Sequence, residues 1–435
     1  MENRKEKISS FLKTLEESEN LSIPQFCYNT KSNSDPKKVF YGGPSYSDEE
    51  IVEAIDSLLF GKWLVSGEKV ALFEKAFSKK INQKHSVMVN SGSSANLVMI
   101  AALKKYFSWQ DNDEILVSVV GFPTTLNPII QNNLKPVFVD IEFNTLNFCL
   151  KELESKITNN TKAIFISPVL GNPPDMDILV EISKKYNIHL ILDGCDSFGS
   201  KWDNKYLNEY CVSSSCSFYP AHHLTTGEGG MVSSNIEEII NIARSLAWWG
   251  RDCYCIGSCN LLSNGSCNKR FSNWITEIPY EIDHKYYFTN IGYNLKPLDL
   301  QGAIGLVQLK KMEEFEIARK NNKQKIQSYL NNIKNISFPI SLEKSDVSWF
   351  GVPIICDSFA IKSKFVSFLE KNGVQTRNYF AGNILLHPAY KNIDNWENYP
   401  NANQVLEKIF FIGCSPTINK SNLDYISLLL NSYEQ

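Results

Sequence analysis

The residues best suited to chemistry lie in a turn that is rich in threonine and glycine. The stretch Ser217–Gly230 contains two adjacent histidines, His222 and His223, and closes on Glu-Gly-Gly. Because an imidazole titrates near neutral pH, it could move a proton in a reaction. The other interpretations are two histidines in a polar turn, or two metal ligands that act together with cysteines.

Two further loops could hold a charged ligand. The loop Asn90–Asn96 follows a strand-like run and opens a helix, so small residues and free N–H groups could receive an anion there. An ordinary capped helix start explains the same residues. Asp193 follows the apolar run His189–Leu192; such a residue is often only a cap, but a buried carboxylate can also keep a pyridinium nitrogen protonated.

Cysteines form the third group of candidate ligands. The chain has eleven, and four of them, Cys253, Cys255, Cys259 and Cys267, lie in one short stretch. In a chain without a visible signal peptide, cysteines are more often thiols or metal ligands than disulfides. Four thiolates on an irregular loop suit an iron–sulfur cluster, and a tetrahedral zinc site uses the same residues.

The elements that must position these residues alternate between strand and helix from about His85 to Ser234. Helical stretches at Ser94–Tyr106 and Met176–Tyr186 separate several of the strands. This alternation predicts a mostly parallel sheet, with ligands beyond the carboxyl ends of its strands. The expected strands are Ser86–Val89, Glu114–Val120, Pro136–Val139, Lys162–Ser167, His189–Leu192, Cys216–Phe218 and Gly230–Ser233.

The sequence as a whole predicts three parts. Residues 1–40 form a polar lead-in, residues 41–310 a large domain, and residues 311–435 a smaller α/β domain. Within the large domain, residues 246–290 show no clear period and are rich in Cys, Trp, Gly and Asn, which is typical of a functional insertion. One long helix is expected at about Leu298–Asn332.

The overall composition is that of a globular α/β protein. The chain has 435 residues, is 43% hydrophobic and 21% charged, and has a formal net charge of −3. That balance indicates neither nucleic acid nor an anionic membrane as a partner. The charged N-terminus lacks the apolar core of a signal peptide, and no apolar run is long enough to span a membrane, so we expect a cytoplasmic protein.

Together these motifs resemble those of the nucleotide-sugar aminotransferases, the DegT/DnrJ/EryC1/StrS family. In that family a serine, four residues and the cofactor-binding lysine precede a Thr- and Gly-rich turn. Here Ser217 matches the serine and His222 falls on the lysine. The resemblance implies fold type I, the architecture of aspartate aminotransferase, with a large, mostly parallel sheet and a smaller C-terminal α/β domain. Further matches, in the family's order, are Gly92-Ser93, Asp193 and Gly292-Tyr293-Asn294.

The resemblance also implies a cofactor, pyridoxal or pyridoxamine 5′-phosphate, and a homodimer. The ring should stack on Phe122 and pair through its nitrogen with Asp193, and Asp196 should lie near the ring substituents. Asn294 should reach the phosphate bound by a neighbouring subunit. Arg377 resembles a substrate-contacting residue, although a surface arginine is equally consistent. The cofactor phosphate should be held by Gly92, Ser93 and Ser217.

Within the family, histidine at the lysine position resembles the nucleotide-sugar 3-dehydratases. A lysine amine forms an imine with pyridoxal phosphate, whereas an imidazole cannot. The cofactor is then best held as pyridoxamine phosphate, with His222 removing a proton from its C4′ carbon and His223 pointing elsewhere. The implied reaction is a lyase step, the C3 dehydration of a nucleotide-linked 4-keto-6-deoxyhexose, in the formation of 3,6-dideoxyhexoses for lipopolysaccharide O-antigen.

Two branches of these dehydratases differ in their electron source. One resembles CDP-4-keto-6-deoxyglucose 3-dehydratase, which uses an iron–sulfur cluster and an electron-donating reductase. The other acts on GDP-4-keto-6-deoxymannose without a cluster and takes its amine from glutamate. A CDP-linked substrate is favoured, although dTDP-linked sugars fit the same pattern. By resemblance, the ligands of a [2Fe–2S] cluster are Cys195, Cys253, Cys255 and Cys267.

Some alternatives remain open at this point. The gap between Cys255 and Cys267 is longer than the family pattern, which leaves Cys259 as a rival fourth ligand. The chain could be the cluster-free dehydratase, or a non-catalytic homologue with a zinc-stabilised loop. An ordinary aminotransferase would need another lysine in place of His222.

Overall fold

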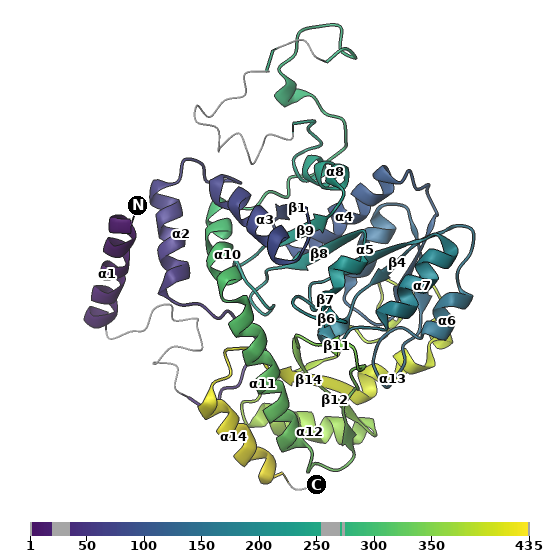
Figure 1. Cartoon of the computed structure of the whole chain (residues 1–435). Coiled ribbons are helices and arrows are strands. Elements are labelled where there is room, and N and C mark those ends of the chain that lie inside the picture. Colours follow the sequence, from purple (N-terminus) through teal and green to yellow (C-terminus); the bar gives the residue numbers. More distant parts are fainter. Residues whose placement is uncertain (1, 20–34, 254–269, 272–274, 434–435) are drawn as a thin grey trace.

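A seven-stranded sheet forms the centre of the computed structural model, which describes residues 2–19, 35–253, 270–271 and 275–433 (Figure 1). Its strand order is β1-β9-β8-β5-β4-β2-β3, and within this sheet only β9 runs against the others. The mostly parallel sheet predicted from the sequence is therefore confirmed. Its strands are β1 (His85–Val89), β2 (Glu114–Ser118), β3 (Lys135–Val139), β4 (Thr161–Ile166), β5 (His189–Asp193), β8 (Ser213–Ser217) and β9 (Gly230–Ser234).

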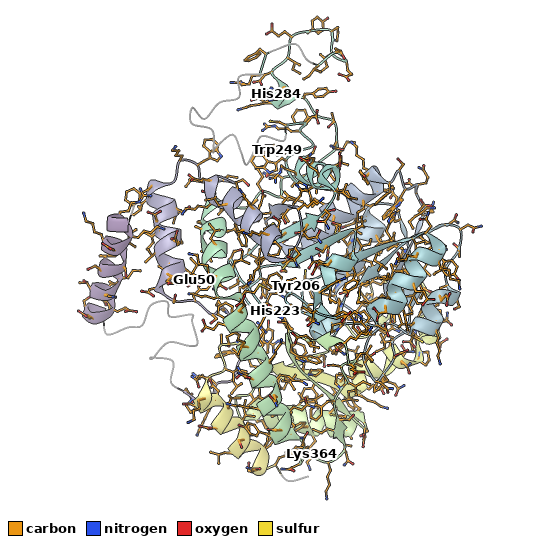
Figure 2. All side chains as sticks on the ribbon, viewed as in Figure 1. Glu50, Tyr206, His223, Trp249, His284 and Lys364 are labelled. Carbon is orange, nitrogen blue, oxygen red and sulfur yellow. The ribbon has the colours of Figure 1, made fainter. Side chains whose placement is uncertain are left out.

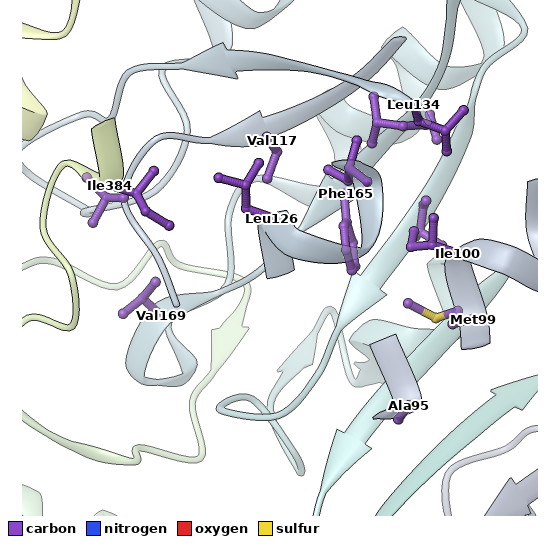
Figure 3. Close-up of a cluster of buried hydrophobic side chains, with 14 of the residues drawn as sticks. Ala95, Met99, Ile100, Val117, Leu126, Leu134, Phe165, Val169 and Ile384 are labelled. Carbon is purple, nitrogen blue, oxygen red and sulfur yellow. The ribbon is translucent and has the colours of Figure 1, made fainter. Parts of the chain in front are cut away.

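Helices cover both faces of this sheet, as the apolar character of the strands requires. On β2, Ile115 and Val117 face the cluster formed with α4 (Gly92–Tyr106) and α5 (Pro123–Gln131), while Leu116 faces α7 (Met176–Tyr186). Figure 3 shows the first of these clusters. The other helices before or beside the large sheet are α1 (Glu2–Glu19), α2 (Asp48–Phe60), α3 (Glu68–Lys80), α6 (Leu150–Ser155) and α8 (Glu237–Ala247).

A second, four-stranded sheet with order β10-β12-β14-β13 lies in the C-terminal part. One face packs on helices, and the other contributes Ile355 and Phe411 to the core of the large sheet. Val39, from the predicted lead-in, is buried in this second part and pairs with Val374. The elements are β10 (Ile336–Ser337), β12 (Gly351–Cys356), β13 (Thr376–Asn378), β14 (Ile409–Gly413), α12 (Phe359–Lys371), α13 (Pro400–Lys408) and α14 (Lys420–Asn431). A small third sheet holds β6 (Lys201–Trp202), β7 (Lys205–Tyr206) and β11 (Ser345–Asp346).

The long helix expected at 298–332 is in fact two helices, α10 (Asp299–Lys310) and α11 (Met312–Leu330). The break falls at Lys311, whose ammonium lies 2.7 Å from Ser47 Oγ and 2.9 Å from the carboxylate oxygens of Glu50. Glu50 is fully buried and also caps α2, so it needs a cation beside it. Helix periodicity does not reveal this pairing, because Glu50 lies more than 250 residues away from Lys311 in sequence.

After α8 the described residues 248–253, 270–271 and 275–290 extend away from the large sheet as an arm, which Figure 1 shows above α8. Its described base is a short ladder in which Asp252 donates to Tyr287 and Thr289 donates to Gly250. A Cβ on Gly250 would lie 1.8 Å from the carbonyl oxygen of Asn290, so this close approach requires glycine. None of the described helices has the length and apolar character that a membrane crossing needs.

Candidate functional site

A cavity of about 760 Å³ opens at the carboxyl ends of the parallel strands. The loops after β1, β2, β4, β5 and β8 form its walls, and residues next to the second sheet close one side. This is where ligands bind in open α/β sheets, because strand ends converge there and helix N-termini point inward. Of the predicted site residues, the cavity is lined by Gly92, Ser93, Phe122, Asp193, Cys195, Asp196, Ser217 and His222.

Gly92 begins α4 beside Ser217 at the floor of the cavity. Ser91 is the N-cap, and its hydroxyl accepts a hydrogen bond from the backbone N–H of Ser94. A Cβ on Gly92 would lie 2.5 Å from Ser217 Cβ and 3.1 Å from Cys195 Sγ. The missing side chain thus lets Ser217 and Cys195 pack against the start of α4. The free N–H groups of a first helical turn beside the Ser217 hydroxyl form an arrangement that suits a phosphate.

Asp193 is held in a buried network that the sequence motifs had not revealed. Its Oδ2 accepts hydrogen bonds from Asn96 Nδ2 and Thr125 Oγ1, each at 2.7 Å, and its Oδ1 accepts from the backbone N–H of Cys195 at 3.2 Å. Ser215 in turn donates to Asn96 at 2.6 Å. Such a network fixes the carboxylate and leaves it facing the cavity, where it can pair with a cationic ring nitrogen.

The signal that could have revealed this network was Asn96 itself. It lies on the apolar side of α4 and is fully buried, next to Ala95, Met99 and Ile100. A buried amide among apolar residues needs partners, so its position on the helix pointed toward a polar group of the neighbouring strands.

His222 borders the cavity from the turn after β8. Its Nδ1 is buried, lies 3.6 Å from Asp196 Oδ1 and has no hydrogen-bond partner among the described residues. Burial and the guanidinium of Arg319 lower the pKa of His222 to about 4, while the carboxylate of Asp193 and a hydrogen bond with the Cys195 backbone oppose this shift. The imidazole is therefore neutral near pH 7 and able to accept a proton.

The pKa of Asp196, which lies beside His222, is shifted in the opposite direction. Burial and the charge of Asp193 raise the pKa of Asp196 to about 7, while a hydrogen bond from the Leu170 backbone and the charge of Arg319 oppose the rise. Its distance from His222 Nδ1 exceeds that of a hydrogen bond, so the two groups face one another without sharing a proton.

His223 has a different environment from His222. Its side chain is buried, its Nε2 lies 2.9 Å from the carbonyl oxygen of Ser348, and it does not line the cavity. The two neighbouring imidazoles therefore differ in access: one reaches the cavity and the other tethers the turn to the chain before β12.

The mouth of the cavity is aromatic and carries one strong cation. Phe122 is 52% exposed and packs its ring edge against Phe380. Arg377 lies over the ring of Tyr41, at 4.0 Å from the ring centre, and it is the only lysine or arginine among the described residues that line the cavity. Tyr41 and Phe350 were not predicted as site residues, since they come from segments remote from every motif.

Asn294 does not line the cavity of its own chain. It is exposed, forms a bridge with Trp248, and accepts a hydrogen bond from the ammonium of Lys296. An exposed Asn294 can contribute to a cofactor site only across an interface with another copy.

The predicted cluster ligands are placed only in part. Cys195 lies at the cavity wall, where burial and the charge of Asp193 raise the pKa of its thiol well above the usual range. Cys253 lies at the base of the arm, with its Sγ 3.7 Å from Nε2 of His284, a residue that Figure 2 shows well apart from His223. The described residues contain no group of three or more His, Cys, Asp or Glu that could hold a metal. Cys255, Cys259 and Cys267 lie outside the described residues.

The sheet, the helix start beside Ser217 and the buried aspartate define a fold type I enzyme of the pyridoxal phosphate class. The chain belongs to the DegT/DnrJ/EryC1/StrS aminotransferase family, whose model matches residues 45–430. The resemblance predicted from the motifs is thereby confirmed.

Several similar proteins are named as 3-dehydratases of nucleotide sugars. The chain is 36% identical over 371 residues to dTDP-4-dehydro-2,6-dideoxy-D-glucose 3-dehydratase of Saccharopolyspora spinosa, covering 83% of this chain and 79% of that protein. It is 37% identical over 387 residues to the lipopolysaccharide biosynthesis protein RfbH of Salmonella typhimurium, covering 87% of each. A structure of E. coli GDP-4-keto-6-deoxy-D-mannose-3-dehydratase with bound hydrated PLP superposes with a TM-score of 0.78 at 31% identity, covering 90% of this chain and 100% of that one.

Proposed function

We propose that this chain removes the C3 hydroxyl of a nucleotide-linked 4-keto-6-deoxyhexose with the help of pyridoxamine phosphate. One observation carries the proposal: an imidazole, His222, borders the cavity, and none of the described residues that line it is a lysine. Without a lysine amine, the family's covalent anchor for the cofactor is missing, and the aminotransferase reaction loses its usual starting state.

The cavity suits this cofactor at three points. The close approach at Gly92, together with Ser93 and Ser217, would receive the phosphate; Asp193 would pair with the ring nitrogen; and Phe122 would cover one face of the ring. When bound, pyridoxamine phosphate supplies a primary amine for the substrate ketone and a ring that accepts electrons. The protein supplies orientation and charge.

His222 is the group that would move the proton at C4′ of the cofactor. Its lowered pKa keeps the imidazole unprotonated at neutral pH, and its unpartnered Nδ1 leaves it able to accept. Proton transfer by a positioned side chain contributes roughly 10²- to 10⁴-fold to a rate. His222 is thus assigned to catalysis, whereas His223 is assigned to holding the turn.

The substrate would enter past Arg377. A nucleotide sugar carries two phosphates, and a guanidinium at the mouth of the cavity can bind them through paired hydrogen bonds. The stacking of Arg377 on Tyr41 would hold it ready for that contact. We retain a CDP-linked sugar as the favoured substrate and test it against dTDP- and GDP-linked sugars.

Complete deoxygenation exchanges C–OH for C–H and needs two electrons and two protons, with water as the other product. We assign the electrons to an external reductase and a [2Fe–2S] cluster held by Cys195, Cys253, Cys255 and Cys267. The position of Cys195 at the cavity wall supports this, because a cluster ligand there would lie beside the cofactor. A bound metal would also offset the unfavourable ionisation of that buried thiol.

A homodimer is part of the proposal. Apolar side chains are exposed on α2 and after it, including Leu59 at 66%, Trp63 at 59% and Leu64 at 61%, and Ile291 near Asn294 is 100% exposed. Large exposed apolar groups of this kind are typical of an interface. Burying them against a second copy would also bring Asn294 toward a neighbouring cavity.

The test is conversion of three nucleotide 4-keto-6-deoxyhexoses, linked to CDP, dTDP or GDP, by anaerobically purified protein with pyridoxamine phosphate and an iron–sulfur flavin reductase. We expect a product that has lost the C3 oxygen, together with iron and acid-labile sulfide bound to the protein. Turnover supported by glutamate, with neither iron nor sulfide after reconstitution, would assign the chain to the cluster-free reaction. Failure to bind pyridoxamine phosphate in an absorbance titration would end the catalytic proposal.

A further inference from the structure

Arg319 is a charged side chain in the interior that the proposed reaction does not use. It lies on α11 and is only 1% exposed. Its Nη1 donates to the carbonyl oxygens of Trp349 and Phe350, at 3.3 and 3.2 Å, and its Nη2 donates to the carbonyl oxygen of His222 at 3.1 Å. Burying a guanidinium is costly, so its retention among backbone carbonyls calls for a reason.

Those three carbonyls belong to the two segments that border His222. The first is the turn itself, in which the His222 N–H donates to the carbonyl oxygen of Tyr219 at 3.0 Å. The second leads into β12, and the ring of Phe350 packs on the imidazole at 5.3 Å between ring centres. One guanidinium therefore fixes both the backbone of His222 and a ring that limits the motion of its side chain.

The same segment also reaches Asp196, the carboxyl that faces His222. Phe350 donates through its N–H to the carbonyl oxygen of Leu170 at 3.1 Å, and the Leu170 backbone donates to Asp196. Leu170 has a φ of +56°, a left-handed conformation that a leucine adopts only when its surroundings hold it there. Arg319 thus contacts the backbone of His222 directly, and it is linked to Asp196 through Phe350 and Leu170.

We propose that Arg319 is a positioning residue that holds the His222 turn, and through Phe350 and Leu170 also Asp196, in the geometry needed at C4′ of the cofactor. This inference rests on the proposed function for its purpose, but its geometry concerns the protein alone. The planar guanidinium suits the task, since its five N–H groups can reach diverging carbonyls that one ammonium could not.

Lys323 provides a matched control on the same helix. It lies one turn after Arg319, and its ammonium lies over the ring of Trp349, at 4.7 Å from the ring centre. It therefore packs on the same segment without a hydrogen bond to His222. Lys323→Gln removes a partly buried cation of α11 and should leave the turn unchanged.

Amide hydrogen exchange, followed by mass spectrometry on the full chain, tests the inference without any cofactor. In Arg319→Gln and Arg319→Lys, the peptide over residues 219–223 should exchange at least about tenfold faster than in the unmodified chain, while β8 and β9 keep their protection. Lys323→Gln should match the unmodified chain throughout. If Arg319→Gln fails to fold, Arg319→Lys, which keeps a cation in the core, carries the test alone. Unchanged exchange of residues 219–223, or uniform acceleration of the whole chain, would overturn the proposal.

A second readout connects the turn to the cofactor. In a His222→Lys background, pyridoxal phosphate should bond covalently to Lys introduced at this position, and borohydride reduction followed by peptide mapping gives the rate. Adding Arg319→Lys should slow that bond formation by about 10-fold or more, with little change in the apparent affinity for pyridoxal phosphate, because a displacement of about 1 Å can cost 10²-fold. Equal rates would contradict the positioning role. If no variant binds pyridoxal phosphate, the proposed function fails, and hydrogen exchange alone decides the role of Arg319.

Discussion

The cavity and the arm both contribute residues to the proposed site, but the residues of the two regions are held in place differently. In the cavity, Asp193 and Ser217 are the last residues of β5 and β8, and further buried groups hold Asp193 in place. In the arm, the described residues are joined by backbone hydrogen bonds between its two sides, by the Arg270–Asp283 ion pair and by the contact of Cys253 with His284. The carboxyl ends of the sheet strands build the first region, whereas the described residues of the arm include no group of three or more possible metal ligands.

This difference predicts a difference in response to mutation. The cavity should keep its shape when a ligand is removed, because its walls are parts of the core. If the proposed cluster is bound, the arm should lose order when the cluster is removed, since metal binding and folding are coupled in such loops.

The largest effect is expected from His222→Lys. A lysine restores a covalent link to pyridoxal phosphate and removes the imidazole, so C3 dehydration should fall by about 10³-fold or more. A new absorbance of the bound cofactor should appear. The control is His223→Gln, which loses the contact with Ser348 and should retain most of the activity. Undiminished dehydration in His222→Lys would refute the assignment of the base.

The second-largest effect is expected on the iron content when the cysteines of the arm are substituted. Cys255→Ser and Cys253→Ser should each remove most of the iron and acid-labile sulfide, because thiolates hold such clusters. Cys211→Ser, at a buried thiol far from the cavity loops, is the matched control and should retain the metal. Pyridoxamine phosphate should still bind to all three variants. Loss of cofactor binding in the arm variants would show that the two regions do not act separately.

A smaller effect is expected from the hydrogen-bond network around Asp193. Hydrogen bonds to charged groups contribute about 1.5–3 kcal/mol, so Asp193→Asn should weaken binding of pyridoxamine phosphate by roughly 10- to 100-fold. Asn96→Ala removes a hydrogen bond to the same carboxylate and should cost less. Fluorescence titration measures both. An Asn96→Ala effect larger than that of Asp193→Asn would place the key interaction elsewhere.

The smallest effect is expected at Asn294. One neutral hydrogen bond contributes about 0.5–1.5 kcal/mol, so Asn294→Ala should weaken cofactor binding by about 3- to 10-fold in a dimer. Sedimentation at several protein concentrations shows whether the dimer is present. If the chain sediments as a monomer and the variant binds the cofactor normally, the prediction that Asn294 contributes to a neighbouring subunit's site is wrong.

Much of the fold could be predicted from the sequence, since the strands are short apolar runs separated by helices. The predicted strands at Glu114–Val120 and His189–Leu192 differ from β2 and β5 by one or two residues at their ends. The break at Lys311 was not predicted, because the apolar pattern continues across it, and the partner of Lys311, the buried carboxylate of Glu50, is remote in sequence.

In the candidate site, too, residues in local motifs could be predicted, whereas residues brought in by packing could not. Gly92, Asp193 and Ser217 lie at or just after the carboxyl ends of strands in recognisable motifs, so local pattern was enough to find them. Arg319 and Phe350 lie in no motif, and only the packing of α11 and β12 against the turn brings them to His222. The sequence motifs thus predicted several residues that line the cavity, but not the residues that position His222.

The most direct test of the central claim is borohydride reduction of the unmodified chain in the presence of pyridoxal phosphate, followed by peptide mapping. Because an imidazole cannot form a reducible imine, we expect the cavity to bind the cofactor without stable labelling of any residue that lines it. Stoichiometric labelling of a lysine at this site, with transfer of an amino group to a keto sugar, would contradict the account.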